Sequence, residues 1–78
     1  MPTQTMWELS HGQSATVIAV TARGAMRRRL QDIGLVPGAR VECINRGMFG
    51  EPTAFCIRGA VVALRRNDAE SVIVESVR

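Results

Sequence analysis

The sequence contains no lysine, no tyrosine, one histidine and two cysteines, and its longest apolar run covers only residues 60–64. A membrane-spanning helix needs about 20 consecutive apolar residues, so none is expected. Residues 1–16 do not combine a basic stretch with an apolar core, so we find no secretory signal. Two cysteines do not make a disulfide framework. We therefore expect a cytoplasmic protein.

The residues that usually carry catalysis are also scarce. His11, the only histidine, falls in the polar run of residues 10–14, and no second metal ligand accompanies it at a suitable spacing. Residues 47–50 lack the lysine and the hydroxyl residue of a phosphate-binding loop. We predict no enzyme, no catalytic residue, no metal ligands and no cofactor, and ligand spacing gives Fe(II) binding no support. Metal sensing through Cys43, Cys56 and His11 is kept as a separate hypothesis.

The two cysteines match no zinc motif, and their relation depends on the register of a predicted hairpin. In one register Cys43 and Cys56 face each other. A slip of one residue instead places Val41 and Cys43 on one face with Phe55 and Ile57, and Cys56 on the other. We favour the slipped register because it gathers four apolar side chains. Cys43 is then a core residue and Cys56 a half-exposed thiol.

A short amphipathic helix is predicted over residues 24–33. Met26, Leu30 and Ile33 recur at helical spacing, so they form one narrow apolar stripe that can dock on a core. Gly34 follows at the position where a helix stop needs a left-handed residue. The helix is therefore predicted to end at a fixed point.

A turn and several short strands follow the helix. Pro37 and Gly38 suit the central positions of a type II turn, with Gly38 supplying the positive φ. Runs of β-branched residues bounded by glycine, proline or polar residues indicate strands. About five such strands, with one short helix inserted after the first core strand, predict a mainly β fold, a small, partly closed barrel formed as one domain by residues 1–78. The predicted strands are residues 15–20, 40–46, 53–58, 60–65 and 71–75, with a strand or anchoring segment at 6–9 and a helical turn at 67–70 capped by Asn67.

All ten basic residues are arginine, and the formal net charge is +3. Arginine makes bidentate contacts to carboxylates and phosphates. Arg27, Arg28 and Arg29 form a run on the predicted helix, where Arg28 faces outward and the other two flank the apolar stripe. Only three aromatic residues are available as stacking platforms, so no nucleic-acid partner is expected. Binding of nucleic acid or phosphate by the arginine-rich surface is the alternative function.

Four apolar residues fall where a small core has difficulty covering them. Met48 and Phe49 lie at the predicted hairpin tip, and Leu35 and Val36 lie beside the helix stop. Apolar residues carried by loops on a rigid scaffold are candidate contacts for another protein. The same side chains are equally able to fold back over an open end of the barrel.

Several segments resemble the ferrous iron transport protein A family, FeoA. They are residues 28–38 (Arg-Arg-Leu-Gln-Asp-Ile-Gly-Leu-Val-Pro-Gly), 50–52 (Gly-Glu-Pro), 62–65 (Val-Ala-Leu-Arg) and 72–75 (Val-Ile-Val-Glu). The resemblance implies an SH3-like barrel with a helix after the first core strand. It also implies a cytoplasmic, non-catalytic accessory of FeoB, a membrane transporter of ferrous iron with a GTP-hydrolysing cytoplasmic domain. Similar domains occur at the C-terminal end of metal-responsive DNA-binding repressors.

The resemblance assigns mainly fold-forming roles to the matching residues. The family's helix, turn and hairpin positions are occupied here by Leu30, Ile33, Gly34, Leu35, Pro37, Gly38, Gly50 and Pro52. For the contact with FeoB we predict Arg28, Leu35, Val36, Met48 and Phe49. The protein is then peripheral to the membrane through its partner, as a monomer or a weak homodimer.

Overall fold

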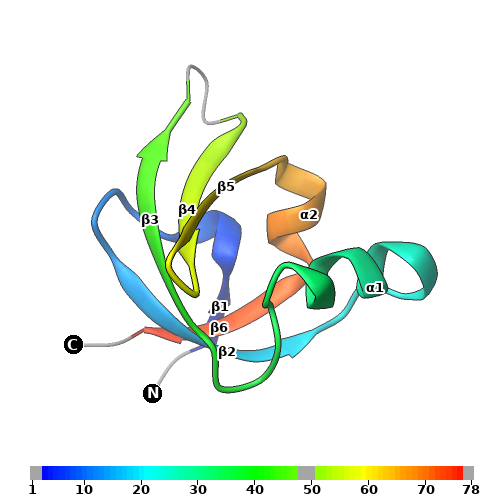
Figure 1. Ribbon diagram of the computed structural model, residues 1–78. Helices are drawn as coiled ribbons and strands as arrows, with labels where there is room; N and C mark the ends of the chain where they lie inside the picture. Colours follow the sequence, from blue (N-terminus) through cyan, green and yellow to red (C-terminus); the bar gives the residue numbers. More distant parts are fainter. Residues whose placement is uncertain (1–2, 48–50, 77–78) are drawn as a thin grey trace.

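The computed structural model describes residues 3–47 and 51–76, and one antiparallel sheet accounts for most of them (Figure 1). The strands lie in the order β1-β6-β2-β3-β4-β5. Figure 1 shows the sheet curving around a common interior, with helix α1 beside it. The elements are β1 (Thr3–Thr5), the 3-10 helix η1 (Met6–Glu8), β2 (Ser14–Val20), α1 (Gly24–Asp32), β3 (Arg40–Arg46), β4 (Thr53–Ile57), β5 (Ala60–Leu64), α2 (Arg66–Glu70) and β6 (Val72–Ser76).

The predicted mainly β fold with a helix after the first core strand is confirmed. The described residues form six strands instead of about five, because Thr3–Thr5 pairs with β6 as β1. Its three polar residues carry no apolar alternation that would have indicated a strand. The inward faces of the sheet bury a core whose largest members are Phe55, Met6, Leu9, Leu30, Leu35 and Ile57.

The segment 6–9 anchors the chain as a helix and not as a strand. Met6–Glu8 forms the 3-10 helix η1, and both Met6 and Leu9 are fully buried. The Thr5 N–H donates to the Glu8 carboxylate at 2.7 Å, which satisfies a donor at the start of this turn. Burial at 6 and 9 is the i, i+3 spacing of a helical turn, so this segment anchors the chain without being a strand.

Helix α1 ends at the predicted place. Gly34 adopts φ +107°, its N–H donates to the Gln31 carbonyl at 3.0 Å, and the Leu35 N–H donates to the Leu30 carbonyl at 3.1 Å. This pair of bonds is a Schellman motif, which brings the residue after the glycine against the residue five positions earlier. Leu30 and Leu35 are both fully buried. The helix stop is therefore also a core contact.

Two tight turns connect the strands near the end of α1. One leads from α1 into β3, and the other joins β4 to β5. The Ala39 N–H donates to the Val36 carbonyl at 3.0 Å across Pro37 and Gly38, and Gly38 has φ +91°. The predicted type II turn is confirmed. Between β4 and β5, Arg58 and Gly59 have φ +52° and +85°, the two positive values that a type I′ hairpin turn requires.

The slipped register of the β3–β4 hairpin is confirmed. Cys43 pairs with Phe55, and Glu42 pairs with Cys56. Cys43 is fully buried, whereas Cys56 is half-buried and faces the other way. Burial raises the pKa of the Cys43 thiol, Glu42 adds to the rise, and Arg46 opposes it. Cys43 is therefore a neutral core thiol at physiological pH.

Helix α2 begins one residue earlier than predicted, and Asn67 is not its cap. The capping position is Arg65, whose side chain makes no cap hydrogen bond. The Glu51 carboxylate instead accepts the Arg66 N–H at 2.8 Å. A residue distant in sequence thus satisfies one of the unpaired donors at the helix start. In the described part of the chain, no helix has the length and apolarity needed to cross a membrane.

Candidate partner-binding surface

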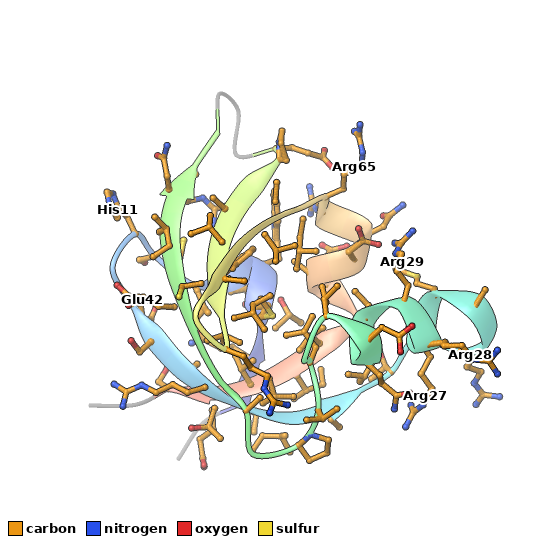
Figure 2. The ribbon with its side chains drawn as sticks, viewed as in Figure 1. His11, Arg27, Arg28, Arg29, Glu42 and Arg65 are labelled. Atoms are coloured by element: carbon orange, nitrogen blue, oxygen red, sulfur yellow. The ribbon has the colours of Figure 1, made fainter. Side chains whose placement is uncertain are left out.

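The three consecutive arginines of α1 have different surroundings. The Arg27 guanidinium donates to the Val20 carbonyl at 2.7 Å, and Arg29 pairs with Asp68 of α2. Arg28 has no hydrogen bond or ion pair with any described residue. Figure 2 shows Arg28 pointing away from the barrel, whereas Arg29 points toward α2. Of the three, Arg28 is the one whose guanidinium has no partner among the described residues.

Leu35, predicted as a partner contact, is wrong in that role, and the alternative that it folds back into the core is the one the structure shows. Leu35 is fully buried because the Schellman motif folds it back onto Leu30. It therefore cannot contact a partner without unfolding the helix exit. Met48 and Phe49, the other predicted apolar contacts, lie outside the described residues, as does the fold position Gly50. The Pro52 carbonyl accepts the Gly47 N–H at 3.0 Å, so it fixes the base of the β3–β4 hairpin.

The turn after α1 forms a shallow groove that we call the helix-exit surface. Val36, Pro37, Arg40 and Arg58 line it with the backbone of residues 38–39, and its volume is about 450 Å³. Val36 is half-buried, and the other three side chains are exposed. The groove therefore combines an apolar floor with two arginines, a composition suited to a protein partner that carries acidic groups. Arg28 does not line it.

The exposure of Ile18 was missed in the sequence. The Gly38 N–H donates to the Val17 carbonyl at 2.8 Å, so the turn contacts β2 at Val17. Ile18 is the next residue of β2. A register irregularity at this point of the β2–β6 ladder leaves Ile18 43% exposed. The run of β-branched residues in β2 indicates a buried strand, and no residue in it marks a bulge. Ile18 is therefore an exposed apolar side chain on the strand that meets the turn.

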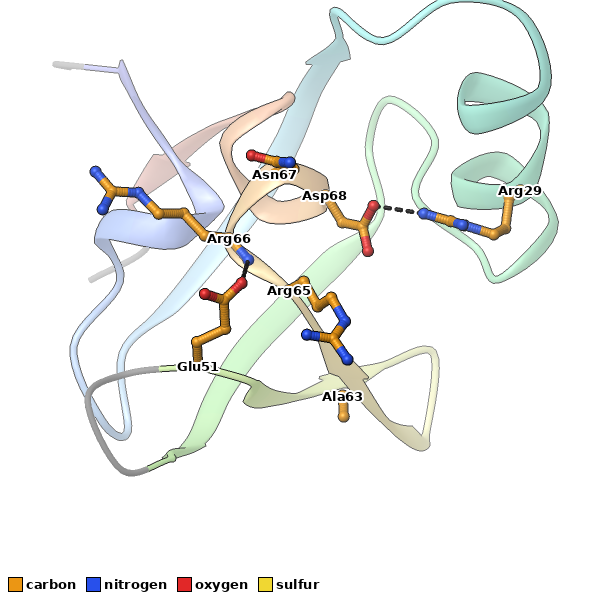
Figure 3. Close-up of a pocket in the computed structure, with 7 residues that line it drawn as sticks. All are labelled: Arg29, Glu51, Ala63, Arg65, Arg66, Asn67 and Asp68. Atoms are coloured by element: carbon orange, nitrogen blue, oxygen red, sulfur yellow. Dashed lines mark hydrogen bonds and ion pairs between the residues drawn. The ribbon is translucent and has the colours of Figure 1, made fainter.

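A second groove, of about 570 Å³, lies between β5 and the two helices (Figure 3). Arg29, Arg65 and Arg66 line it together with Glu51, Ala63, Asn67 and Asp68. Both acidic groups are already engaged, since Asp68 pairs with Arg29 and Glu51 accepts the Arg66 N–H. The Arg65 side chain forms no hydrogen bond or ion pair with a described residue, and Figure 3 shows its guanidinium beside Ala63. The groove is therefore basic where Arg65 lies beside β5.

Trp7 forms the centre of a third cluster. The Arg46 guanidinium carbon lies 4.8 Å from the centroid of the Trp7 ring, and that of Arg66 lies 5.6 Å away. Arg46 also donates to the Trp7 carbonyl at 2.9 Å and to the Leu9 carbonyl at 3.0 Å. Arg46 is thus committed to holding η1 on β3, which identifies this cluster as a fold contact.

His11, Cys43 and Cys56, the residues of the metal-sensing hypothesis, do not form a ligand set in the described structure. His11 is exposed in the loop before β2, Cys43 is in the core, and Cys56 faces the opposite side of β4. Within residues 3–47 and 51–76, no three His, Cys, Asp or Glu side chains gather in a way that could hold a metal ion.

A six-stranded, strongly curved antiparallel sheet with one helix between its second and third strands defines an SH3-like barrel, and its open surfaces suit the binding of another protein. The FeoA domain model matches residues 4–76, nearly the whole chain. The chain therefore belongs to the FeoA family.

Known relatives share both the fold and the sequence. FeoA from Chlorobium tepidum has 36% identity and a TM-score of 0.89, covering 96% of this chain and 71% of its own. FeoA of Stenotrophomonas maltophilia, solved with zinc and described as an SH3 domain protein proposed to activate ferrous iron transport, has 34% identity and a TM-score of 0.84, covering 92% and 89%.

A curated relative places the same domain in a much longer protein. It is the Fe(2+) transport protein A/Fe(2+) transporter FeoB fusion protein of Porphyromonas gingivalis, 31% identical over 70 residues. The match covers 90% of this chain and only 8% of that protein. Membership of the FeoA family associates this chain with ferrous iron transport.

Proposed function

We propose that this chain is a non-catalytic, cytoplasmic accessory protein of ferrous iron uptake. In this proposal it binds the cytoplasmic part of a FeoB-type membrane transporter and modulates its GTP hydrolysis. It stays peripheral to the membrane through that partner and acts as a monomer or a weak homodimer. The observation that carries the proposal is the Porphyromonas gingivalis fusion protein, in which a relative of this chain and the transporter are one polypeptide. Domains that work together are held at high effective concentration by such a link.

The helix-exit surface and the adjacent helix supply the proposed contacts. Val36 and Pro37 offer an apolar floor, and Arg40 and Arg58 offer charges at its margin. Arg28, outside the groove, adds a cation that no described residue neutralises. In such an interface the apolar centre supplies affinity, and the charged rim orients the partner. Leu35 supports this surface from below through the core.

Iron uptake in a strain that lacks this gene tests the proposal. Uptake of radioactive Fe(II) should fall in the deletion strain and recover when the native gene is returned. Val36→Asp should fail to restore uptake, because it places a carboxylate on the apolar floor. His11→Asp is the matched control, since His11 lies in a loop away from α1 (Figure 2) and should restore uptake fully. Equal uptake in the presence and absence of the gene would contradict the proposed function.

GTP hydrolysis by the isolated cytoplasmic domain of the transporter tests the regulatory part. Addition of the native chain should change the rate, and addition of the Val36→Asp variant should not. An unchanged rate together with restored uptake would separate assembly of the transporter from control of its nucleotide cycle, and would remove the regulatory part of the proposal.

A further inference from the structure

Strand β5 ends the sheet, and its outer edge is unpaired within the described residues. β5 pairs with β4 alone, from Ala60 opposite Ile57 to Leu64 opposite Thr53. No charged or proline residue interrupts its sequence, Ala-Val-Val-Ala-Leu. Val61 is 68% exposed and Ala63 is also exposed. An edge strand of this kind can accept a further strand.

The turn between β4 and β5 determines which backbone groups face that edge. In a two-residue type I′ hairpin the residues that flank the turn form a hydrogen-bonded pair, so Ala60 bonds to Ile57. Hydrogen-bonded and non-hydrogen-bonded pairs alternate along an antiparallel ladder. Val62 and Leu64 therefore also bond to β4. The N–H and C=O groups of Val61 and Ala63 point away from β4, and they form no hydrogen bond with any described residue.

The charges around this edge are positive at both ends. Arg58 precedes β5 in the turn, and Arg65 follows it directly; neither forms an ion pair within the described residues. The nearby carboxylates of Glu51 and Asp68 are already engaged by the Arg66 N–H and by Arg29. Figure 3 shows Arg65 beside Ala63, at the point where the strand reaches the basic groove. A segment that pairs with β5 therefore meets uncompensated cations at its two ends.

The positive charges at the two ends of the β5 edge favour an acidic segment over a second copy of β5 as the strand that pairs with it. A second copy of β5 that used all four outward groups would run antiparallel and centre on Val62. It would bring the Arg58 end of one copy beside the Arg65 end of the other, which is repulsive. An extended segment with acidic residues at its ends has the complementary charge.

We propose that the β5 edge binds an extended segment of another protein, apolar or β-branched in its centre and acidic at both ends, by strand addition to Val61 and Ala63. Main-chain hydrogen bonds to these two residues supply affinity, and Arg58 and Arg65 supply charge selection. The proposal goes beyond the proposed function, because it holds whether or not the segment belongs to the transporter.

Amide hydrogen exchange measured by NMR tests the pairing directly. The probe is a synthetic peptide of alternating valine and threonine with glutamates at both ends. In the free protein, the Val61 and Ala63 amides should exchange fast and those of Ala60, Val62 and Leu64 slowly. The peptide should slow Val61 and Ala63 selectively. A peptide with lysines in place of the glutamates should produce no such protection.

Variants separate main-chain pairing from charge. Ala63→Pro removes an outward N–H without removing a bond to β4, so it should weaken peptide binding, whereas Ala63→Thr keeps the N–H and should bind normally. Continued slow exchange at Val62 and Leu64 shows that each variant is folded. Arg65→Glu should bind the peptide about tenfold more weakly, and Arg23→Glu, with the same change in net charge at an exposed arginine outside both surfaces, should bind as the native chain does.

Three results would overturn the proposal. They are no binding of the acidic peptide, equal binding of the lysine peptide, and binding without protection of Val61 and Ala63. Protection of these two amides that rises with protein concentration in the absence of peptide would identify a second copy as the occupant instead. A failed transporter interaction would leave all of these results unchanged, so the two proposals fail separately.

Discussion

Arg29 of α1 and Asp68 of α2 form an ion pair that joins the two helices across 39 positions of sequence. The Arg29 side chain is 62% exposed and that of Asp68 is 16% exposed. Both residues line the basic groove beside β5. This pair neutralises Arg29, and Glu70 pairs with Arg66 at 2.8 Å, so Arg65 is the groove's available cation.

The Arg29–Asp68 pair should contribute little to the stability of the fold. A double-mutant cycle with Arg29→Ala and Asp68→Ala should give a coupling of about 0.2–1 kcal/mol, because one partner is largely exposed to solvent. The coupling should shrink in 1 M salt, where the Debye length is about 3 Å. Thermal unfolding of the four proteins measures it. A large coupling that salt does not change would show that the pair is effectively buried.

Gly34→Ala should destabilise the protein by about 1–3 kcal/mol. Gly34 has φ +107°, and a Cβ there would lie 2.5 Å from the Arg58 Cδ and 3.3 Å from the Ile57 Cγ2. Gly12→Ala is the control, since Gly12 also has a positive φ, +83°, with nothing within 4 Å of its Cβ position. Chemical denaturation should show a larger loss at Gly34.

The clash at Gly34 can be separated from its backbone strain. Arg58→Ala removes the Cδ atom, so Gly34→Ala should cost less in that background than in the native chain. An equal cost in both backgrounds would mean that the Arg58 side chain moves aside freely and that the backbone conformation accounts for the whole effect.

The Cys43 thiol should make stability fall at alkaline pH. Burial raises the pKa of Cys43 above its ordinary value of 9.0, so the unfolded chain loses this proton first. The contribution of Cys43 to the free energy of unfolding is therefore constant below about pH 9. It decreases as the pH rises from there toward the pKa of Cys43 in the folded protein. The chain has no lysine or tyrosine to titrate in the same range, which keeps this signal distinct.

Denaturant unfolding from neutral pH to about pH 10 measures this effect. Cys43→Val should remove most of the alkaline decrease, and Cys56→Ser is the matched control at the half-buried thiol. In the folded protein a thiol reagent should also modify Cys56 well before Cys43. Equal reactivity of the two thiols would contradict the burial of Cys43.

Arg46→Lys should cost about 1–3 kcal/mol of stability. Arg46 donates to two main-chain carbonyls, of Trp7 and Leu9, and its guanidinium lies over the Trp7 ring. Both bonds come from one nitrogen, Nη1, and a lysine ammonium would lack the planar guanidinium that lies over the Trp7 ring while making them. Arg66→Lys is the control, since the Arg66 guanidinium lies farther from the ring, at 5.6 Å, and its side chain is exposed. Unfolding followed by the fluorescence of Trp7, the only tryptophan, compares the two variants.

The helix, its stop and the following turn were predictable because their signals are local. Gly34 and the Pro37–Gly38 pair dictate backbone angles regardless of what packs around them. The β3–β4 register was predictable for another reason, since only one pairing buries Val41 and Cys43 with Phe55. In each case a few neighbouring residues contain the physical constraint.

The exposure of single side chains was less predictable. Leu35 follows a helix stop, where a loop residue is usually solvated, yet a hydrogen bond to the Leu30 carbonyl turns it into the core. Ile18 is exposed through an irregularity between β2 and β6 that neither strand's sequence marks. The cap of α2 comes from Glu51, which lies 15 residues earlier in the chain. These outcomes depend on contacts between distant segments.

Binding of the purified chain to the cytoplasmic domain of the organism's FeoB-type transporter, measured by isothermal titration calorimetry, tests the central claim most directly. We predict saturable binding by the native chain and by His11→Asp, and binding weakened at least about tenfold in Val36→Asp and Arg28→Glu, each shown to be folded by circular dichroism. No binding by the native chain, or equal binding by all four proteins, would contradict the account.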